Sequence, residues 1–322
     1  MARSVGVRSH QSSRVTVVRR GVQAHAPAKV NLGLRVAARR SDGFHEIETL
    51  FTTVGIADTV EVQLATDGVR GVVRDARFGS RNSSEPTPAM GPSNLAWRAA
   101  DAYLAAAGAG TGVWIALDKR LPVAAGLGGG SSDAAAVLRS LTRLVPSDVD
   151  SSSLAARLGS DVPFFASGFA AARGSGRGER LVQLELPSRW LVLVNPGVPV
   201  AASDAYRWIA DFTAPIDWTA VAQSWAGEEA PRLRNDLQPG VIEHVPEVAE
   251  ALRVLGDVGL ASPLMSGSGA SCFALASSEA QARRATTTLR AGYPGWWVVT
   301  ASAPADEAWR TIRAVPGAAP HE

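Results

Sequence analysis

The chain has 322 residues, 46% of them hydrophobic, which is enough for two ordinary domains with packed cores. No stretch of the sequence is long and apolar enough to predict a membrane-spanning helix. The formal net charge is +2, but residues 1–23 hold five arginines and no acid, and the remaining 27 basic residues face 30 acidic ones. This mildly acidic body gives no indication of a nucleic-acid-binding surface.

Residues 1–21 differ in composition from the rest of the chain. They are rich in Ser and Arg and lack the apolar run of a secretory signal, so we expect a disordered basic tail, with a cleaved transit peptide as the alternative. The single cysteine, Cys272, cannot form an intrachain disulfide, which is typical of a reducing compartment. The sequence therefore predicts a cytoplasmic protein with neither a membrane nor a nucleic acid as partner.

Hydrophobic periodicity predicts strands and helices that alternate along the chain. The predicted strands are Val22–His25, Val30–Val36, Thr59–Leu64, Val113–Leu117, Trp190–Val194, Cys272–Ala276 and Trp296–Thr300. The predicted helices cover about 94–107, about 132–144, Ser153–Leu158, Glu247–Leu255 and Glu279–Arg290. Residues 75–93 are rich in Pro, Ser and Gly and predict a loop. A change of composition near Leu186–Ser188 divides the pattern into two lobes of mixed α and β structure, at 22–187 and 188–316.

Lysine is almost absent from the chain. The sequence has 30 arginines and only two lysines, Lys29 and Lys119. A lysine carries a compact point charge on a thin stem, which a planar guanidinium cannot copy. We therefore expect both lysines to lie where an arginine would not serve.

A glycine-rich loop stands before the helix predicted at 132–144. The stretch LPVAAGLGGGSSDAA, residues 121–135, leaves its backbone bare, so that several N–H groups can converge on an anion at a helix N-terminus. It is neither a Walker A loop nor the dinucleotide-binding glycine pattern. The alternative is a tight strand-to-helix turn with Ser131 or Ser132 as the N-cap. The loop favours phosphate binding.

Three further stretches accompany this loop. They are PAKVNLGLRVAARRSDGFHEIETLF at 27–51, LGSDVPFF at 158–165 and MSGSGASCFAL at 265–275. In this order the four stretches resemble the motifs of the GHMP kinase superfamily, and the resemblance covers most of the chain outside the tail, residues 75–93 and residues 213–230. It implies an α+β fold of two lobes, an N-terminal lobe like domain 2 of ribosomal protein S5 and a ferredoxin-like C-terminal lobe.

The resemblance also implies a reaction. Such kinases hold ATP with its phosphates against the glycine loop, use Mg²⁺, and phosphorylate a small-molecule alcohol. The motifs are most similar to the branch whose acceptor is the 2-hydroxyl of a cytidine diphosphate-linked methylerythritol, in the non-mevalonate route to isoprenoids. The stretch DGFHE carries this distinction, because a cytidine pocket needs its aromatic ring and histidine. The alternatives are a sibling kinase for homoserine, mevalonate or a sugar, and a non-catalytic ligand-sensing paralogue.

Two residues match the catalytic positions of the family. The resemblance makes Asp161 the group that accepts the proton of the acceptor hydroxyl, and Lys29 its partner. From the sequence alone, Asp161 could equally be the N-cap of a short helix, and Lys29 could be a surface lysine. The retention of both residues argues against the non-catalytic alternative.

The acceptor site is expected at a second group of residues. The resemblance places Phe44, His45 and Tyr206 around the cytosine, Asn31 beside the acceptor hydroxyl, and Ser266 and Gly267 near the diphosphate. Stacking between a base and aromatic rings contributes ~1–3 kcal/mol per base. The alternatives are a core position for Tyr206, a turn position for His45 and a plain hairpin turn for residues 266–271.

The ATP site is expected at a third group. Asn94, Leu95 and Lys119 match family positions around the adenine, with a helix N-cap, a core leucine and a solvated strand-end lysine as the alternatives. The phosphates are assigned to the loop residues Pro122, Val123, Ala124, Ala125, Gly126, Leu127, Gly128, Gly129, Gly130, Ser131 and Ser132. Ala124 and Ala125 stand where relatives often carry glycine, a change that would stiffen the loop. The sequence assigns no metal ligand and does not decide the oligomeric state.

Overall fold

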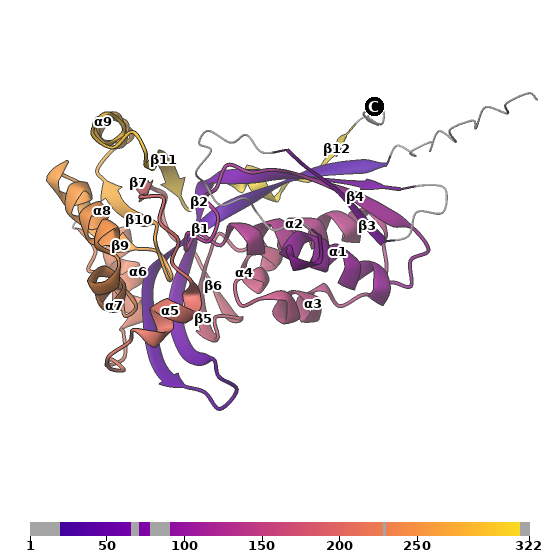
Figure 1. Ribbon diagram of the computed structural model, residues 1–322, viewed down its shortest axis with the longest axis horizontal. Helices are drawn as coiled ribbons and strands as arrows, with labels where there is room; N and C mark the ends of the chain where they lie inside the picture. Colours follow the sequence, from indigo (N-terminus) through magenta and orange to yellow (C-terminus); the bar gives the residue numbers. More distant parts are fainter. Residues whose placement is uncertain (1–19, 66–70, 78–90, 228–229, 316–322) are drawn as a thin grey trace, which may run out of the picture.

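A computed structural model of the protein describes residues 20–65, 71–77, 91–227 and 230–315. The described chain forms two sheets, each with helices packed against it (Figure 1). No helix in the described part of the chain is long and apolar enough to cross a membrane.

A long antiparallel hairpin organises the N-terminal sheet. Its strands are β1 (Gly21–Arg39) and β2 (His45–Leu64), which pair along nearly their whole lengths. Residues 26–34 are buried without interruption, because β1 passes from the helices of the N-terminal lobe to the core of the C-terminal lobe. Alternate side chains of a strand point to opposite faces, so Lys29 and Asn31 share a face.

The other strands of this sheet flank the hairpin. They are β3 (Gly71–Arg77), β4 (Gly112–Asp118), β5 (Ala171–Gly176), β6 (Arg180–Leu184), β8 (Arg234–Asn235) and β12 (Arg313–Val315). β4 and β5 pair with β2, β3 lies parallel to β4, and β8 and β12 pair with β1. β2 therefore pairs with β5 over its first half and with β4 over its second half.

Four helices pack together beside this sheet in Figure 1. They are α1 (Leu95–Ala106), α2 (Gly129–Leu144), α3 (Ser151–Leu158) and α4 (Val162–Ser167), and the short 3₁₀ helix η1 (Gly91–Ser93) precedes α1. Residues 134–136 of α2 are fully buried alanines, whose small side chains let the helix lie close to β1. This close packing fixes the glycine loop, which leads into α2, over the middle of the sheet.

The C-terminal sheet has the strand order β11-β7-β10-β9. Its strands are β7 (Arg189–Asn195), β9 (Ala261–Met265), β10 (Cys272–Ala276) and β11 (Trp297–Ala303), and all neighbours are antiparallel. The helices of this part are α5 (Ala202–Arg207), α6 (Trp218–Ala226), α7 (Gln238–His244), α8 (Pro246–Asp257) and α9 (Glu279–Gly292). Helices connect β7 to β9 and β10 to β11, as in a ferredoxin-like lobe.

The end of the described chain returns to the N-terminal sheet. The 3₁₀ helix η2 (Glu307–Arg310) places Arg310 so that its Nε donates to the carbonyl oxygen of Gly168 at 2.8 Å. β12 then pairs with the first residues of β1. The lobe boundaries at 22–187 and 188–316 stay a prediction, and the segment after β11 contacts the first lobe.

Several predicted elements differ from those in the structure. The two strands predicted within 22–36 are one strand, and the first half of β2 was not predicted, because its polar residues hide the alternation. Residues 75–77 belong to β3 rather than to a loop, since they pair with β4. α2 begins at Gly129, before the predicted start, because glycines can occupy its first turn. Most of residues 75–93 and the tail lie outside the described residues.

Candidate active site

A cavity of about 1220 Å³ lies between the two lobes. Its walls come from the β1–β2 hairpin, the glycine loop, the start of α4, residues 200–212 and the turn between β9 and β10. Ordinary small-molecule sites measure roughly 300–1000 Å³. The cavity is thus large enough to hold two ligands side by side.

Lys29 and Asp161 lie next to each other in the wall of this cavity. Lys29 Nζ lies 3.5 Å from Asp161 Oδ2 and donates hydrogen bonds to Asn31 Oδ1 at 2.7 Å and to the carbonyl oxygen of Gly126 at 3.0 Å. The Lys29 side chain is 4% exposed and that of Asp161 is 30% exposed. The ammonium is therefore fixed by buried acceptors, while the carboxylate opens towards the space that a ligand would fill.

Asp161 does not cap the helix that follows it. It occupies the N-cap position of α4, but its side chain makes no capping hydrogen bond. The three aspartates that do cap helices in the described chain, Asp150, Asp217 and Asp306, each accept from backbone N–H groups. The structure therefore does not support the alternative that Asp161 serves as a capping residue.

The glycine loop is tied to its surroundings through its own carbonyl groups. The backbone N–H of Lys29 donates to Leu127 O at 3.0 Å, and the N–H of Ser271 donates to Ala125 O at 3.2 Å. Gly126 has φ +73°, and a Cβ there would collide with the carbonyl oxygen of Ser266. Gly128 is the N-cap of α2 with φ 70°. With its carbonyls engaged, the loop can turn its N–H groups towards the cavity.

Most residues of the predicted phosphate loop line the cavity. They are Pro122, Val123, Ala124, Ala125, Gly126, Gly128, Gly129, Gly130 and Ser131. Leu127 and Ser132 are 1% exposed and do not line it, so side-chain contacts of these two residues with ATP are not supported. Ala124 has φ 52°, in the left-handed region that favours glycine.

Lys119 lies in a buried cluster with two carboxylates. Its Nζ donates to Asp133 Oδ2 at 2.6 Å and also to Asp58 Oδ2. Asp58 accepts in addition from the backbone N–H groups of Arg120 at 2.6 Å and Leu121 at 2.9 Å. Lys119 precedes the glycine loop and Asp133 follows it, so this cluster joins the two ends of the loop. The alternative that Lys119 is a solvated lysine at a strand end is therefore wrong.

Asp133 has an unusual environment for a carboxylate. It is 3% exposed and lines the cavity, and its Oδ1 finds no hydrogen-bond partner among the described residues. Burial raises its pKa to about 7, with the ammonium of Lys119 acting in the opposite direction. The group can therefore change its charge near neutral pH.

Asn94 and Leu95 line the same cavity at the start of α1. Asn94 is the N-cap of this helix, and its Oδ1 accepts from Ala96 N at 2.8 Å. The helix-cap alternative for Asn94 is thus confirmed, and the adenine contact of Asn94 and Leu95 stays a prediction.

Two of the residues predicted for the acceptor site, His45 and Tyr206, are in contact with each other in the cavity wall. The rings of His45 and Tyr206 stack with their centroids 4.8 Å apart and 16° between their planes. Phe44 is 51% exposed, and the guanidinium of Arg177 lies 5.0 Å from its ring centroid. Burial and, to a lesser extent, the nearby charge of Asp161 raise the pKa of Tyr206. Burial, and then Arg39, lower the pKa of His45.

The remaining predicted acceptor residues are divided between cavity and core. Asn31 and Gly267 line the cavity, and Asn31 Nδ2 donates to Thr49 Oγ1 at 2.8 Å. Ser266 is fully buried, does not line the cavity, and donates from Oγ to Gly126 O at 3.0 Å. Ser266 thus supports the glycine loop, and a direct contact of its hydroxyl with a diphosphate is not supported.

Sequence reasoning missed several residues of the site. The cations Arg39, Arg177 and Arg207 line the cavity, as does Phe212. Among 30 arginines none of these carried a distinguishing signal, and Phe212 adjoins a stretch outside the recognised motifs. Asp58 lies outside every glycine-rich motif and reaches Lys119 only in the folded chain.

Comparison with known proteins agrees with the resemblance to GHMP kinases. The model of the GHMP kinase N-terminal domain matches residues 94–169, and that of the GHMP kinase C-terminal domain matches residues 220–295. A 4-diphosphocytidyl-2-C-methyl-D-erythritol kinase of Deinococcus radiodurans is 45% identical over 86% of this chain and 91% of the relative. The enzyme of that name from Thermus thermophilus is 42% identical over 84% of this chain and 94% of the relative.

Solved structures agree with the sequence comparison. A crystal structure of 4-(cytidine 5′-diphospho)-2C-methyl-D-erythritol kinase matches with a TM-score of 0.72 and 42% identity, over 87% of this chain and 98% of the other. A homoserine kinase from Cytophaga hutchinsonii matches with a TM-score of 0.63 at 17% identity, over 97% of this chain and 100% of the other, which shows the shared fold alone. The chain belongs to the GHMP kinase superfamily and, within it, to the family of 4-diphosphocytidyl-2-C-methyl-D-erythritol kinases.

Proposed function

We propose that this protein transfers the γ-phosphoryl group of ATP to the 2-hydroxyl of 4-diphosphocytidyl-2-C-methyl-D-erythritol, a step of the non-mevalonate isoprenoid route. The observation that carries the proposal is the Lys29–Asp161 pair in a cavity whose walls include both the glycine loop and the His45–Tyr206 stack. This arrangement supports the assignment of Asp161 as a proton acceptor that acts between a phosphate-binding loop and aromatic groups suited to a nucleobase.

The chemistry follows from the positions of the two charged groups. The acceptor oxygen forms a bond to the γ-phosphorus as the bond from that phosphorus to the β–γ bridging oxygen breaks, and ADP leaves. Asp161 takes the hydroxyl proton. Lys29 is held by Asn31 and Gly126, so its ammonium is preorganised to attract the negative charge that develops on the transferring oxygens.

The nucleotide is assigned to the part of the cavity formed by the glycine loop, Asn94 and Leu95. The N–H groups at the start of α2 suit the phosphates. Lys119 is engaged by Asp58 and Asp133, so we assign it to holding the loop in shape rather than to a free contact with the base.

Mg²⁺ is part of the proposal. This ion usually takes one or two carboxylates together with substrate phosphates, so it needs no cage of protein ligands. The described residues contain no cluster of three or more His, Cys, Asp or Glu side chains that could form such a cage. Asp133 Oδ1, without a partner among the described residues and in the cavity wall with Ser131, fits the role of a single ligand. When bound, the ion would offset the charge of the phosphates.

The cellular setting is proposed from the charge of the chain and from its single buried cysteine. The single cysteine is buried in β10, and the body of the chain is mildly acidic. We propose a cytoplasmic enzyme that acts on a small molecule and has neither nucleic acid nor membrane as partner.

One incubation tests the proposal. The protein is mixed with ATP, Mg²⁺ and the cytidyl substrate, and ADP and a new phosphomonoester are followed by coupled assay and ³¹P NMR. We expect both products in equal amounts. ADP formation without the phosphomonoester would indicate ATP hydrolysis and contradict the assignment. No reaction with any acceptor, alongside binding of ATP, would favour the ligand-sensing alternative.

A further inference from the structure

Two large apolar side chains that are exposed to solvent line the cavity. In the part of the chain that the structure describes, the exposed large hydrophobic residues are Phe44, Val182 and Phe212. Phe44 and Phe212 line the cavity, whereas Val182, in β6, does not. Exposed aromatic rings in a cavity are surfaces that a ligand can cover, and the water released favours binding. Phe44 is already assigned to the cytidine, but Phe212 has no assigned role.

Phe212 belongs to the α5–α6 connection, residues 208–217, which follows Tyr206 directly in the chain. Ile209, Ala210 and Asp211 of this connection line the cavity together with Phe212. Tyr206 stacks on His45 and lies near Asp161. The connection therefore continues the part of the cavity wall to which Tyr206 belongs.

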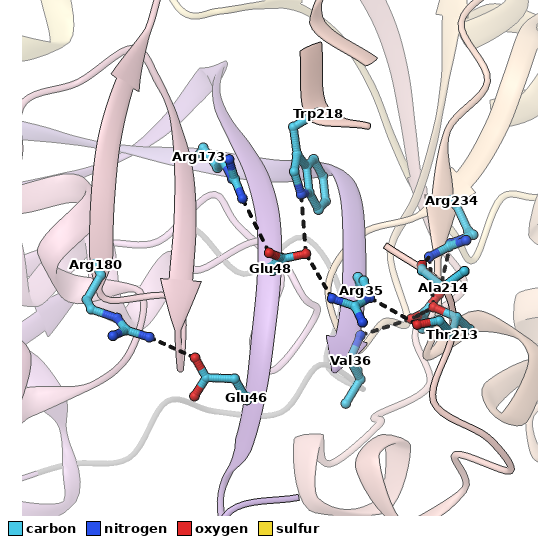
Figure 2. A network of polar contacts seen from close by, with 11 residues as sticks. Arg35, Val36, Glu46, Glu48, Arg173, Arg180, Thr213, Ala214, Trp218 and Arg234 are labelled. Carbon is cyan, nitrogen blue, oxygen red and sulfur yellow. Dashed lines mark hydrogen bonds and ion pairs between the residues drawn. The ribbon is translucent and has the colours of Figure 1, made fainter. Parts of the chain in front are cut away.

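The connection is held in place immediately after Phe212. Thr213 O accepts from Arg35 Nε at 3.0 Å, and Thr213 Oγ1 donates to Asp236 Oδ2 at 2.6 Å. Arg234 Nη2 donates to Thr213 Oγ1 at 2.7 Å and to Ala214 O at 2.8 Å. Figure 2 shows Thr213 and Ala214 between Arg35 and Arg234.

This anchor is joined to the hairpin that carries Phe44 and His45. Arg35 Nη1 donates to Glu48 Oε2 at 3.1 Å, and Glu48 also receives hydrogen bonds from Arg173 at 3.3 Å and Trp218 at 3.5 Å (Figure 2). The backbone N–H of Val36 donates to Asp236 Oδ2 at 2.9 Å. The backbone next to Phe212 is thus held by a network with residues of β1, β2 and α6, and β2 begins at His45 of the predicted base pocket.

We propose that Phe212 forms an apolar wall against the cytidine moiety of the acceptor and that Thr213 is the positioning residue that holds it there. This inference rests on the proposed function, because it names a further specificity contact of the same site. Phe212 contacts the nucleoside part of the substrate, and the ATP part of the cavity is independent of it.

The first experiment compares Phe212→Ala with Val182→Ala, which also removes an exposed apolar side chain but lies outside the cavity. We expect Phe212→Ala to raise KM for the cytidyl substrate about fivefold or more, as loss of a stacking surface does, with KM for ATP unchanged. Calorimetry with cytidine 5′-diphosphate alone should show a loss of affinity of similar size. Phe212→Tyr, which keeps the ring, should restore both values.

The second experiment tests the anchor. Thr213→Val keeps the shape of the side chain and removes the hydroxyl, so we expect a rise of about two- to tenfold in KM for the cytidyl substrate without a change in KM for ATP. Thr213→Ser keeps the hydroxyl and should behave as the wild type. Equal KM values for all three proteins would overturn the role of Thr213.

The outcomes separate this inference from the proposed function. If the wild type turns over the cytidyl substrate and Phe212→Ala behaves like Val182→Ala, Phe212 is a plain surface residue and the inference alone fails. If Phe212→Ala affects the full substrate but not cytidine 5′-diphosphate, the ring does not contact the nucleoside, which also overturns the inference. If the wild type does not use the cytidyl substrate, the proposed function fails and this contact fails with it.

Discussion

Lys29 Nζ and Asp161 Oδ2 lie 3.5 Å apart, although the two residues are far apart in the sequence, one in β1 and the other at the start of α4. Lys29 is held by a neighbouring side chain on β1 and by the glycine loop, and Asp161 begins α4 without capping it. Aspartate at the start of a helix normally accepts a stabilising capping hydrogen bond, and Asp161 lacks it. Its pairing with a buried ammonium in a cavity wall is the strongest structural argument for a catalytic role.

We predict that Asp161→Asn lowers kcat at least about 100-fold, because removal of a positioned general base typically costs 10²–10⁴ in rate. Folding should be retained, since no capping bond is lost. Asp150→Asn is the matched control, because Asp150 truly caps α3 and Asn caps about equally well. Activity of Asp161→Asn within a factor of a few of the control would remove Asp161 from the mechanism.

The two lysines should respond differently to replacement by arginine. Lys29 is confined, since a Cβ at Gly128 would lie 3.1 Å from its Cγ and a Cβ at Gly267 would lie 3.1 Å from its Nζ. A planar guanidinium cannot take this space, so we expect Lys29→Arg to abolish most turnover.

Lys119→Arg changes the cluster that joins the ends of the glycine loop, so its main effect should be on KM for ATP. Steady-state kinetics with ATP and acceptor varied in turn distinguish the two variants. Wild-type behaviour of both would mean that the near absence of lysine elsewhere in the chain carries no information about these positions.

The methyl group of Ala124 should lower the free energy of unfolding of the protein, because the backbone at this position is in the left-handed region. Its φ of 52° costs a residue other than glycine roughly 1–2 kcal/mol. Ala124→Gly relieves this strain but gives the unfolded chain more freedom, at about 0.4–1 kcal/mol. We therefore expect the free energy of unfolding of Ala124→Gly to be unchanged or raised by up to about 1.5 kcal/mol. Ala125 is buried and has no positive φ, so Ala125→Gly should lower the free energy of unfolding. Urea denaturation of both variants measures these changes, and an equal loss of stability in the two would contradict the strain at Ala124.

Asp133 should make stability depend on pH near neutrality. Burial raises its pKa in the folded protein to about 7 from an ordinary value of 3.8. The folded state then binds this proton more tightly than the unfolded state, so the contribution of Asp133 to stability is full below about pH 4 and is lost as the pH rises through 7. Asp133→Asn does not titrate. The difference in unfolding free energy between wild type and variant should therefore shift in favour of the variant from pH 5 to pH 8, and a constant difference would contradict the raised pKa.

The sequence was informative where chemistry is encoded in contiguous residues. The glycine loop, Lys29, Asp161 and His45 lie in short motifs, the family resemblance added Tyr206, and the structure brings them all to one cavity. Such motifs are readable because backbone conformation and residue type are specified together over a few positions.

Contacts between distant segments were not predictable in this way. Asp58 meets Lys119 only because β2 and β4 pair, and β3 forms because β4 offers it an edge. Ser132 and Ser266 carry hydroxyls suited to a phosphate, but packing turns both side chains away from the cavity. Phe212 acquires its place from a network around Thr213 and Asp236, of which the local sequence gives no sign.

A competition assay tests the central claim most directly. Equal concentrations of the cytidyl substrate, methylerythritol phosphate, mevalonate and homoserine are incubated together with the protein, ATP and Mg²⁺, and the phosphorylated products are quantified by ³¹P NMR and mass spectrometry. The ratio of products under competition equals the ratio of kcat/KM values. The account predicts that the cytidyl compound is phosphorylated at least about 100-fold faster than any other, because remote binding of the cytidine positions the reacting hydroxyl. Comparable phosphorylation of methylerythritol phosphate, mevalonate or homoserine would contradict it.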